Sequence, residues 1–139
     1  MKHTRIFAIA LLVLFLTGCG STSRINPISL LSANAWELST LKGTSEMSQF
    51  AAGLPNLSFL EGGRLAGYAG CNNFSGGFSL EGSGIQLDPG AMTKKACPGN
   101  GEDLFMDALG QVKNFKVEKE KLILLNGDSE LMSFIPKKD

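Results

Sequence analysis

The stretch GCNNFSGGF, residues 70–78, decides the fold, because it places a cysteine among glycines and asparagines. Glycines inside strand-like sequence mark bulges, sharp bends or close approaches between backbone segments. Asn72 and Asn73 tolerate a left-handed backbone and bond to neighbouring amides, so they suit a turn, with a polar binding spot as the alternative. The stretch therefore predicts bent strands beside Cys71. The cysteine itself has three interpretations: a nucleophile, a metal ligand or half of a disulfide.

Short segments with alternating apolar residues surround this stretch. Turn signals separate them at Glu61–Gly63, at Gly82–Gly84 and at Asn126–Asp128. Short strands divided by glycine-rich turns are typical of an antiparallel β domain. We predict strands within residues 35–41, 56–60, 64–71, 74–80, 84–88, 115–117, 121–125 and 131–135.

One segment, residues 100–115, has helical rather than strand periodicity. Its apolar residues recur on one side of a helix, and Asn100 is the expected N-cap. Glu102 and Asp103 add negative charge to the first turn, and Gly110 is expected near the end. We predict an α+β, mostly β fold, with antiparallel strands curled around one amphipathic helix. The expected packed centre is Phe59, Phe74, Phe78, Leu104, Phe105 and Leu109.

The first residues have the layout of an export signal. A basic head with Lys2 and Arg5 precedes a short apolar run, which is only about half of the roughly 20 residues that span a bilayer. The run ends in LTGC, residues 16–19, which resembles the lipobox of bacterial lipoproteins. That resemblance implies cleavage after residue 18 and lipidation of Cys19, whereas an ordinary cleaved signal is the alternative. In enterobacterial lipoproteins an Asp after the cysteine acts as an inner-membrane retention signal, so the resemblance, with Gly20 there, implies the outer membrane.

The predicted organisation is a lipoprotein signal peptide at residues 1–18, a flexible tether at residues 19–29 and one domain at residues 30–139. Removing the signal peptide takes away Lys2 and Arg5 but none of the 13 acidic residues, so the formal charge falls from 0 to −2. No basic patch stands out in the sequence, so we do not expect nucleic acid as a partner. We expect a lipid-anchored protein on the outer membrane that faces the periplasm. The sequence assigns no oligomeric state.

Catalytic chemistry is restricted by the lack of histidine. The only histidine, His3, lies in the signal peptide, so Cys–His and Ser–His pairs are excluded from the mature chain. A lysine-activated nucleophile near Lys94 or Lys95 remains as the alternative. Structural zinc needs four Cys or His ligands, which the mature chain lacks, and residues 126–130 lack the alternating carboxylates of a calcium loop. We therefore predict no enzyme activity, no metal and no cofactor.

Cys71 and Cys97 are the two cysteines that remain after lipidation of Cys19. Exported proteins fold in an oxidising compartment, where an even pair of cysteines favours a disulfide. A disulfide between residues 71 and 97 would raise the free energy of unfolding by about 3.5 kcal/mol in the chain-entropy model. Two separate buried thiols are the alternative.

The same motifs carry a family resemblance over about residues 30–135. GCNNFSGGF, then MTKKAC at residues 92–97, then the short helix and its following strands, resemble the META domain of HslJ-like bacterial lipoproteins. Lys95 departs from the family, which often has methionine there. The resemblance implies strands wrapped around one helix, a heat-shock association and a link to novobiocin tolerance. It supplies no catalytic residues.

The function expected from these features is binding in envelope stress or novobiocin-type tolerance. Three alternatives remain for the binding role. They are a pilotin-like chaperone of another envelope protein, an inhibitor of such a protein, and a carrier of a hydrophobic ligand. Large exposed apolar patches would favour a protein partner. An apolar cavity between helix and sheet would favour the carrier.

Overall fold

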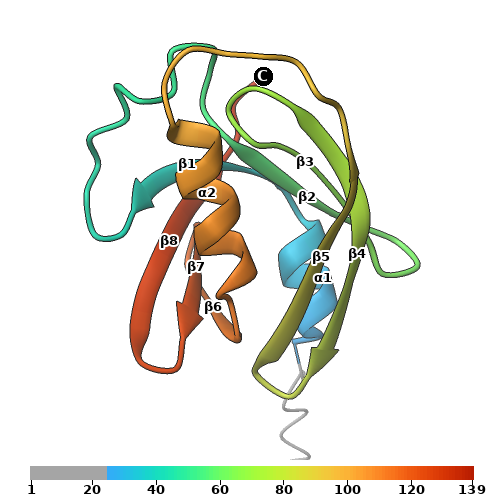
Figure 1. Cartoon of the computed structure of the whole chain (residues 1–139). Helices are drawn as coiled ribbons and strands as arrows, with labels where there is room; N and C mark the ends of the chain where they lie inside the picture. The colour runs from blue at the N-terminus through green and yellow to red at the C-terminus, as the bar shows by residue number, and fades with distance from the viewer. Residues whose placement is uncertain (1–24) are drawn as a thin grey trace, which may run out of the picture.

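The computed structural model describes residues 25–139, and in them eight antiparallel strands form a closed barrel (Figure 1). Each strand pairs with its neighbours in the sequence, and β1 closes the barrel by pairing with β8. The mostly β, antiparallel class predicted from the sequence is confirmed. The strands are β1 (Ala35–Leu41), β2 (Asn56–Leu60), β3 (Arg64–Tyr68), β4 (Asn73–Glu81), β5 (Gly84–Met92), β6 (Asn114–Glu118), β7 (Lys121–Asn126) and β8 (Ser129–Pro136).

The barrel is weakest between β5 and β6, which share a single residue pair, Gly84 with Asn114. Two backbone hydrogen bonds flank that pair, from Ile85 N to Lys113 O at 2.9 Å and from Phe115 N to Ser83 O at 3.2 Å. Beyond it the two strands diverge. Helix α2 (Gly101–Gly110) stands in front of the resulting opening and contacts β5 and β8 (Figure 1).

The apolar side of α2 packs into the barrel. Phe105 is fully buried, and its ring centroid lies 6.5 Å from that of Phe74 and 6.4 Å from that of Phe134. Of the predicted packed centre, four residues are buried and two, Phe78 and Leu104, are partly buried against the same cluster. The four buried members are Phe59, Phe74, Phe105 and Leu109.

The structure differs from the prediction in the cap of the helix and in how the strands surround it. Asn100 is the N-cap residue of α2, but its side chain makes no capping bond, and only its carbonyl accepts from Leu104 N at 3.1 Å. The expected wrapping of strands around a single helix is not confirmed. The sheet instead closes on itself through β1 and β8, and a second helix is present.

That second helix, α1 (Pro27–Ser32), begins inside the segment assigned to the tether. The side chain of Asn26 accepts from Ile28 N at 3.0 Å, and Pro27 fits the first turn because no intrahelical bond needs its nitrogen. Leu31 is fully buried, and its carbonyl accepts from Trp36 Nε1 at 2.7 Å. Residues 27–29 of the predicted tether are therefore helical. Neither helix of the described part has the length and apolar character needed to cross a membrane.

Candidate functional site

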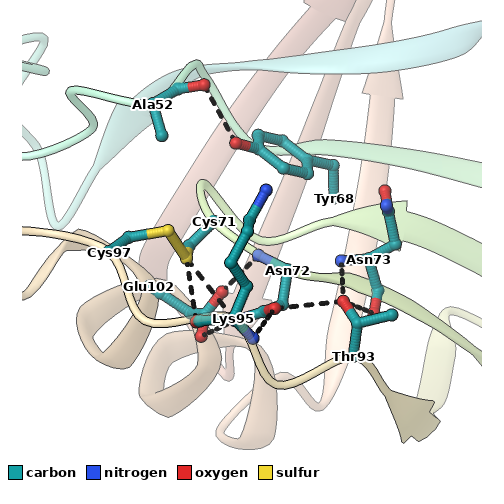
Figure 2. Close-up of a disulfide and its surroundings, with 9 residues drawn as sticks. All are labelled: Ala52, Tyr68, Cys71, Asn72, Asn73, Thr93, Lys95, Cys97 and Glu102. Atoms are coloured by element: carbon teal, nitrogen blue, oxygen red, sulfur yellow. Dashed lines mark hydrogen bonds between the residues drawn. A yellow bond between two sulfur atoms is a disulfide. The ribbon is translucent and has the colours of Figure 1, made fainter.

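A disulfide joins Cys71 to Cys97, with their Cα atoms 6.0 Å apart (Figure 2). This is the pairing that the sequence predicts. The bond ties the β3–β4 connection to the segment that leads from β5 to α2. Neither sulfur is a thiolate in this state, so neither serves as a nucleophile or a metal ligand. Cys19, the predicted lipidation site, lies outside the described residues.

Asn72, beside the disulfide, is buried and organises the polar contacts around it (Figure 2). Its Nδ2 donates to Lys95 O at 2.9 Å and to Glu102 Oε1 at 3.0 Å. Its Oδ1 accepts from Lys95 N at 2.6 Å and from Thr93 Oγ1 at 3.0 Å. An asparagine side chain has two donors and two acceptor sites, so all four are satisfied within the chain.

Glu102 completes this arrangement from the first turn of α2. Its second carboxylate oxygen accepts from Asn72 N at 2.6 Å. Both oxygens of Glu102 therefore bond to one residue, and α2 is fixed to the β3–β4 connection. From the sequence, Glu102 was expected only to place negative charge in the first turn of the helix, where it interacts favourably with the helix dipole. Its partner lies 30 positions away in the sequence, which no local pattern reveals.

Gly70 allows the chain to turn into this arrangement. Its φ is +96°, and a Cβ at this position would lie 2.5 Å from Cδ1 of Phe50. The backbone conformation and the nearby ring both exclude a side chain. Phe50 is itself buried and would also lie 2.6 Å from a Cβ placed on Gly101. One aromatic ring therefore packs against the turn before Cys71 and against the start of α2.

A small polar hollow of about 100 Å³ lies next to the disulfide. Glycines, both cysteines and the polar residues Gln49, Glu102 and Asp103 are among the residues that line it. The Glu102 oxygens facing this region are already bonded to Asn72. Residues 25–139 contain no group of three or more His, Cys, Asp or Glu side chains that could hold a metal ion.

The segment after β5 is the exposed part of the site. Lys94 and Lys95 are both exposed, while the backbone of Lys95 is held by Asn72 through its N–H and its carbonyl. The Sγ of Cys71 lies 3.3 Å from Lys95 O, but a disulfide sulfur has no hydrogen to donate, so this is only a contact. The sequence singled out both lysines as possible activators of a nucleophile. The structure places both residues at the surface, and its hydrogen bonds engage only the backbone of Lys95.

Replacing Asn72 with alanine tests the importance of this network. We expect Asn72→Ala to lower the free energy of unfolding by about 3 kcal/mol, because Lys95 N–H, Lys95 C=O, the Thr93 hydroxyl and one oxygen of Glu102 lose a side-chain partner. Chemical denaturation monitored by circular dichroism measures the loss. Asn73→Ala is the matched control, since Asn73 is exposed and bonds to Thr93 only through its backbone N–H and carbonyl. Equal losses in the two variants would contradict the role of Asn72.

The fold and the disulfide define a small antiparallel barrel domain, and comparison with protein families identifies it. The family model described as "META domain" matches residues 29–139. The chain therefore belongs to the META domain family, as the sequence motifs predicted. A comparison with curated proteins found no match.

Solved structures show the same fold at low sequence identity. A DUF4847 family protein from Bacteroides vulgatus is 15% identical with a TM-score of 0.57, and the match covers 78% of this chain and 96% of that one. An NMR structure of a protein from Burkholderia xenovorans is 21% identical with a TM-score of 0.61, covering 82% of this chain and 90% of that one. A further protein, also solved by NMR, is 20% identical with a TM-score of 0.61, covering 79% and 95%. These similarities concern the fold alone.

Proposed function

We propose that this META domain protein is a lipid-anchored, non-enzymatic protein of the bacterial envelope that acts by binding. The observation that carries the proposal is the state of its reactive groups. Cys71 and Cys97 are joined to each other, and the side chain of Asn72 is fully bonded within the chain. The site has neither a free thiol nor an imidazole to perform acid–base or nucleophilic chemistry.

The anchor in this proposal is a lipid on Cys19. Support comes from the basic head, the short apolar run and the LTGC sequence in that order. Each buried methylene of an acyl chain adds about 0.8 kcal/mol of membrane affinity, so two or three chains hold a protein firmly. The proposed location is the outer membrane, with the barrel in the periplasm.

The proposed role is tolerance of envelope stress and of novobiocin-type antibiotics. The support is the resemblance to HslJ-like lipoproteins together with membership of the META domain family. A chaperone or inhibitor of another envelope protein is a second candidate. It is favoured by the exposed, rigidly held segment at Lys94 and Lys95. A carrier of hydrophobic ligands has less support, because large side chains such as Phe105 and Phe134 occupy the barrel interior.

A complementation experiment tests this proposal. We expect the wild-type gene to restore growth of a deletion strain at a novobiocin concentration that stops the deletion strain. A Cys19→Ala gene should fail to restore growth and should lose palmitate labelling, because the protein is no longer retained at the membrane. Ser21→Ala is the matched control and should behave as wild type. Full labelling of the Cys19→Ala protein, or no effect of the gene on growth, would contradict the proposal.

A further inference from the structure

We propose that residues Thr93–Cys97 form a substrate-like inhibitory loop for an endopeptidase that cleaves after basic residues, with Lys94 in its primary specificity pocket. This inference rests on the proposed function in one respect, that the protein acts by binding, and it names the class of partner. Rigid, preorganised segments bind proteases tightly, because little conformational freedom is lost on association.

The shape of the loop fits a protease cleft. The chain makes no turn or bend from Thr93 to Cys97, and each residue from Thr93 to Ala96 is exposed. None of these residues has a positive φ. Proteases bind their substrates as extended strands, and a segment without turns or left-handed residues is compatible with that conformation. The loop crosses one end of the barrel, and the β4–β5 turn and the start of α1 lie towards the opposite end (Figure 1).

The residue before Lys94 is fixed to the barrel. Thr93 N donates to Asn73 O at 3.0 Å, and Thr93 Oγ1 accepts from Asn73 N at 3.1 Å. The same hydroxyl donates to Asn72 Oδ1 at 3.0 Å. Thr93 is therefore held through both its backbone and its side chain.

The residues after Lys94 are fixed as firmly. Asn72 holds Lys95 through Oδ1 to its N–H, at 2.6 Å, and through Nδ2 to its carbonyl, at 2.9 Å (Figure 2). Two positions further on, Cys97 is bonded covalently to Cys71. The side chain of Asn72 therefore holds the residue before Lys94, through Thr93 Oγ1, and the residue after it, through the backbone of Lys95.

Lys94, rather than Lys95, suits the primary pocket. A serine protease binds the N–H and the carbonyl of the residue that it cleaves after, and the carbonyl enters the oxyanion hole. Within residues 25–139, no hydrogen bond engages the N–H or the carbonyl of Lys94. Both backbone groups of Lys95 are bonded to Asn72. The exposed ammonium of Lys94 matches a pocket that contains a carboxylate.

The hydrogen bonds from Asn72 and the Cys71–Cys97 disulfide explain why such a loop would inhibit the protease rather than be digested by it. The protease serine attacks the Lys94 carbonyl carbon, the bond to Lys95 N breaks, and the Lys95 amine takes the proton held by the catalytic base. In an ordinary substrate this amine diffuses away and water hydrolyses the acyl enzyme. Here Asn72 and the disulfide retain it beside the ester, so the amine attacks the ester, returns its proton and reforms the peptide bond.

Inhibition of trypsin by the full chain in mild detergent tests this inference. We expect stoichiometric inhibition, with the Lys94–Lys95 bond mostly intact after prolonged incubation by mass spectrometry. Lys94→Ala should weaken inhibition by about 100-fold or more, as expected for a residue that fills the primary pocket. Lys94→Phe should transfer inhibition from trypsin to chymotrypsin, because the pocket of chymotrypsin is hydrophobic.

Lys116→Ala is the matched control, since Lys116 is an exposed lysine on β6, and it should inhibit as wild type does. Circular dichroism of each variant confirms that it is folded. Rapid cleavage after Lys94, or inhibition that survives Lys94→Ala, would overturn the inference. Absence of inhibition would also overturn it, while a continued requirement for Cys19 in novobiocin tolerance would leave the proposed function standing.

Discussion

Replacing both Cys71 and Cys97 with alanine is expected to lower the free energy of unfolding by about 3.5 kcal/mol. The disulfide restricts the unfolded chain between residues 71 and 97, and its loss returns that freedom to the unfolded state. The folded state changes less, because Asn72 still bonds to Thr93, Lys95 and Glu102. The variant should therefore remain a barrel of reduced stability.

Denaturation of the double-alanine variant beside wild type, with and without reductant, measures this effect. Reductant should shift the wild type towards the variant and leave the variant unchanged. Equal midpoints for oxidised wild type and variant would show that the disulfide adds nothing to stability. Alkylation of wild type without reductant should leave both cysteines unlabelled.

The other large effect is expected for Phe105→Ala, at about 4 kcal/mol of lost stability. Phe105 is fully buried, with the rings of Phe74 and Phe134 as neighbours. Truncation leaves a cavity between α2 and the barrel that these rings cannot fill without leaving their own packing. Thermal and chemical denaturation of the purified variant measure the loss.

Gly110→Ala provides the contrast on the same helix. Gly110 is exposed at the end of α2, and an added Cβ would have no atom within 4 Å. We expect an unchanged or slightly higher stability, since alanine is favoured over glycine in helices by about 1 kcal/mol. A loss for Phe105→Ala no larger than about 1 kcal/mol would mean that α2 is not packed as part of the core.

The strands and α2 could be predicted because alternation and turn signals are local. The prediction was least accurate at β5, which continues through Met92 rather than ending at Asp88. Pro89 signals a strand end, but it lies beside Gly90, whose φ is +62° and whose N–H bonds to Asp88 Oδ1 at 2.9 Å. A strand that has lost its partner on one side tolerates such a proline.

Helix α1 and the role of Asn72 could not be predicted for different reasons. The six residues of α1 are too few to show helical periodicity, and the helix is held by tertiary contacts such as that of Leu31 with Trp36. Asn72 suited either a turn or a binding spot. Its side-chain partners at residues 93, 95 and 102 become neighbours only when the barrel folds.

The sparse junction between β5 and β6 has a mechanical consequence. A closed barrel resists unravelling because every strand is held on both sides, yet here one residue pair completes the circle at Gly84 and Asn114. Local opening at this junction would expose one edge of β5 while the hydrogen bonds of the other seven strand pairs stay in place. We therefore expect amide hydrogen exchange to be fastest, among the paired strand edges, along the edges of β5 and β6 that meet at this junction.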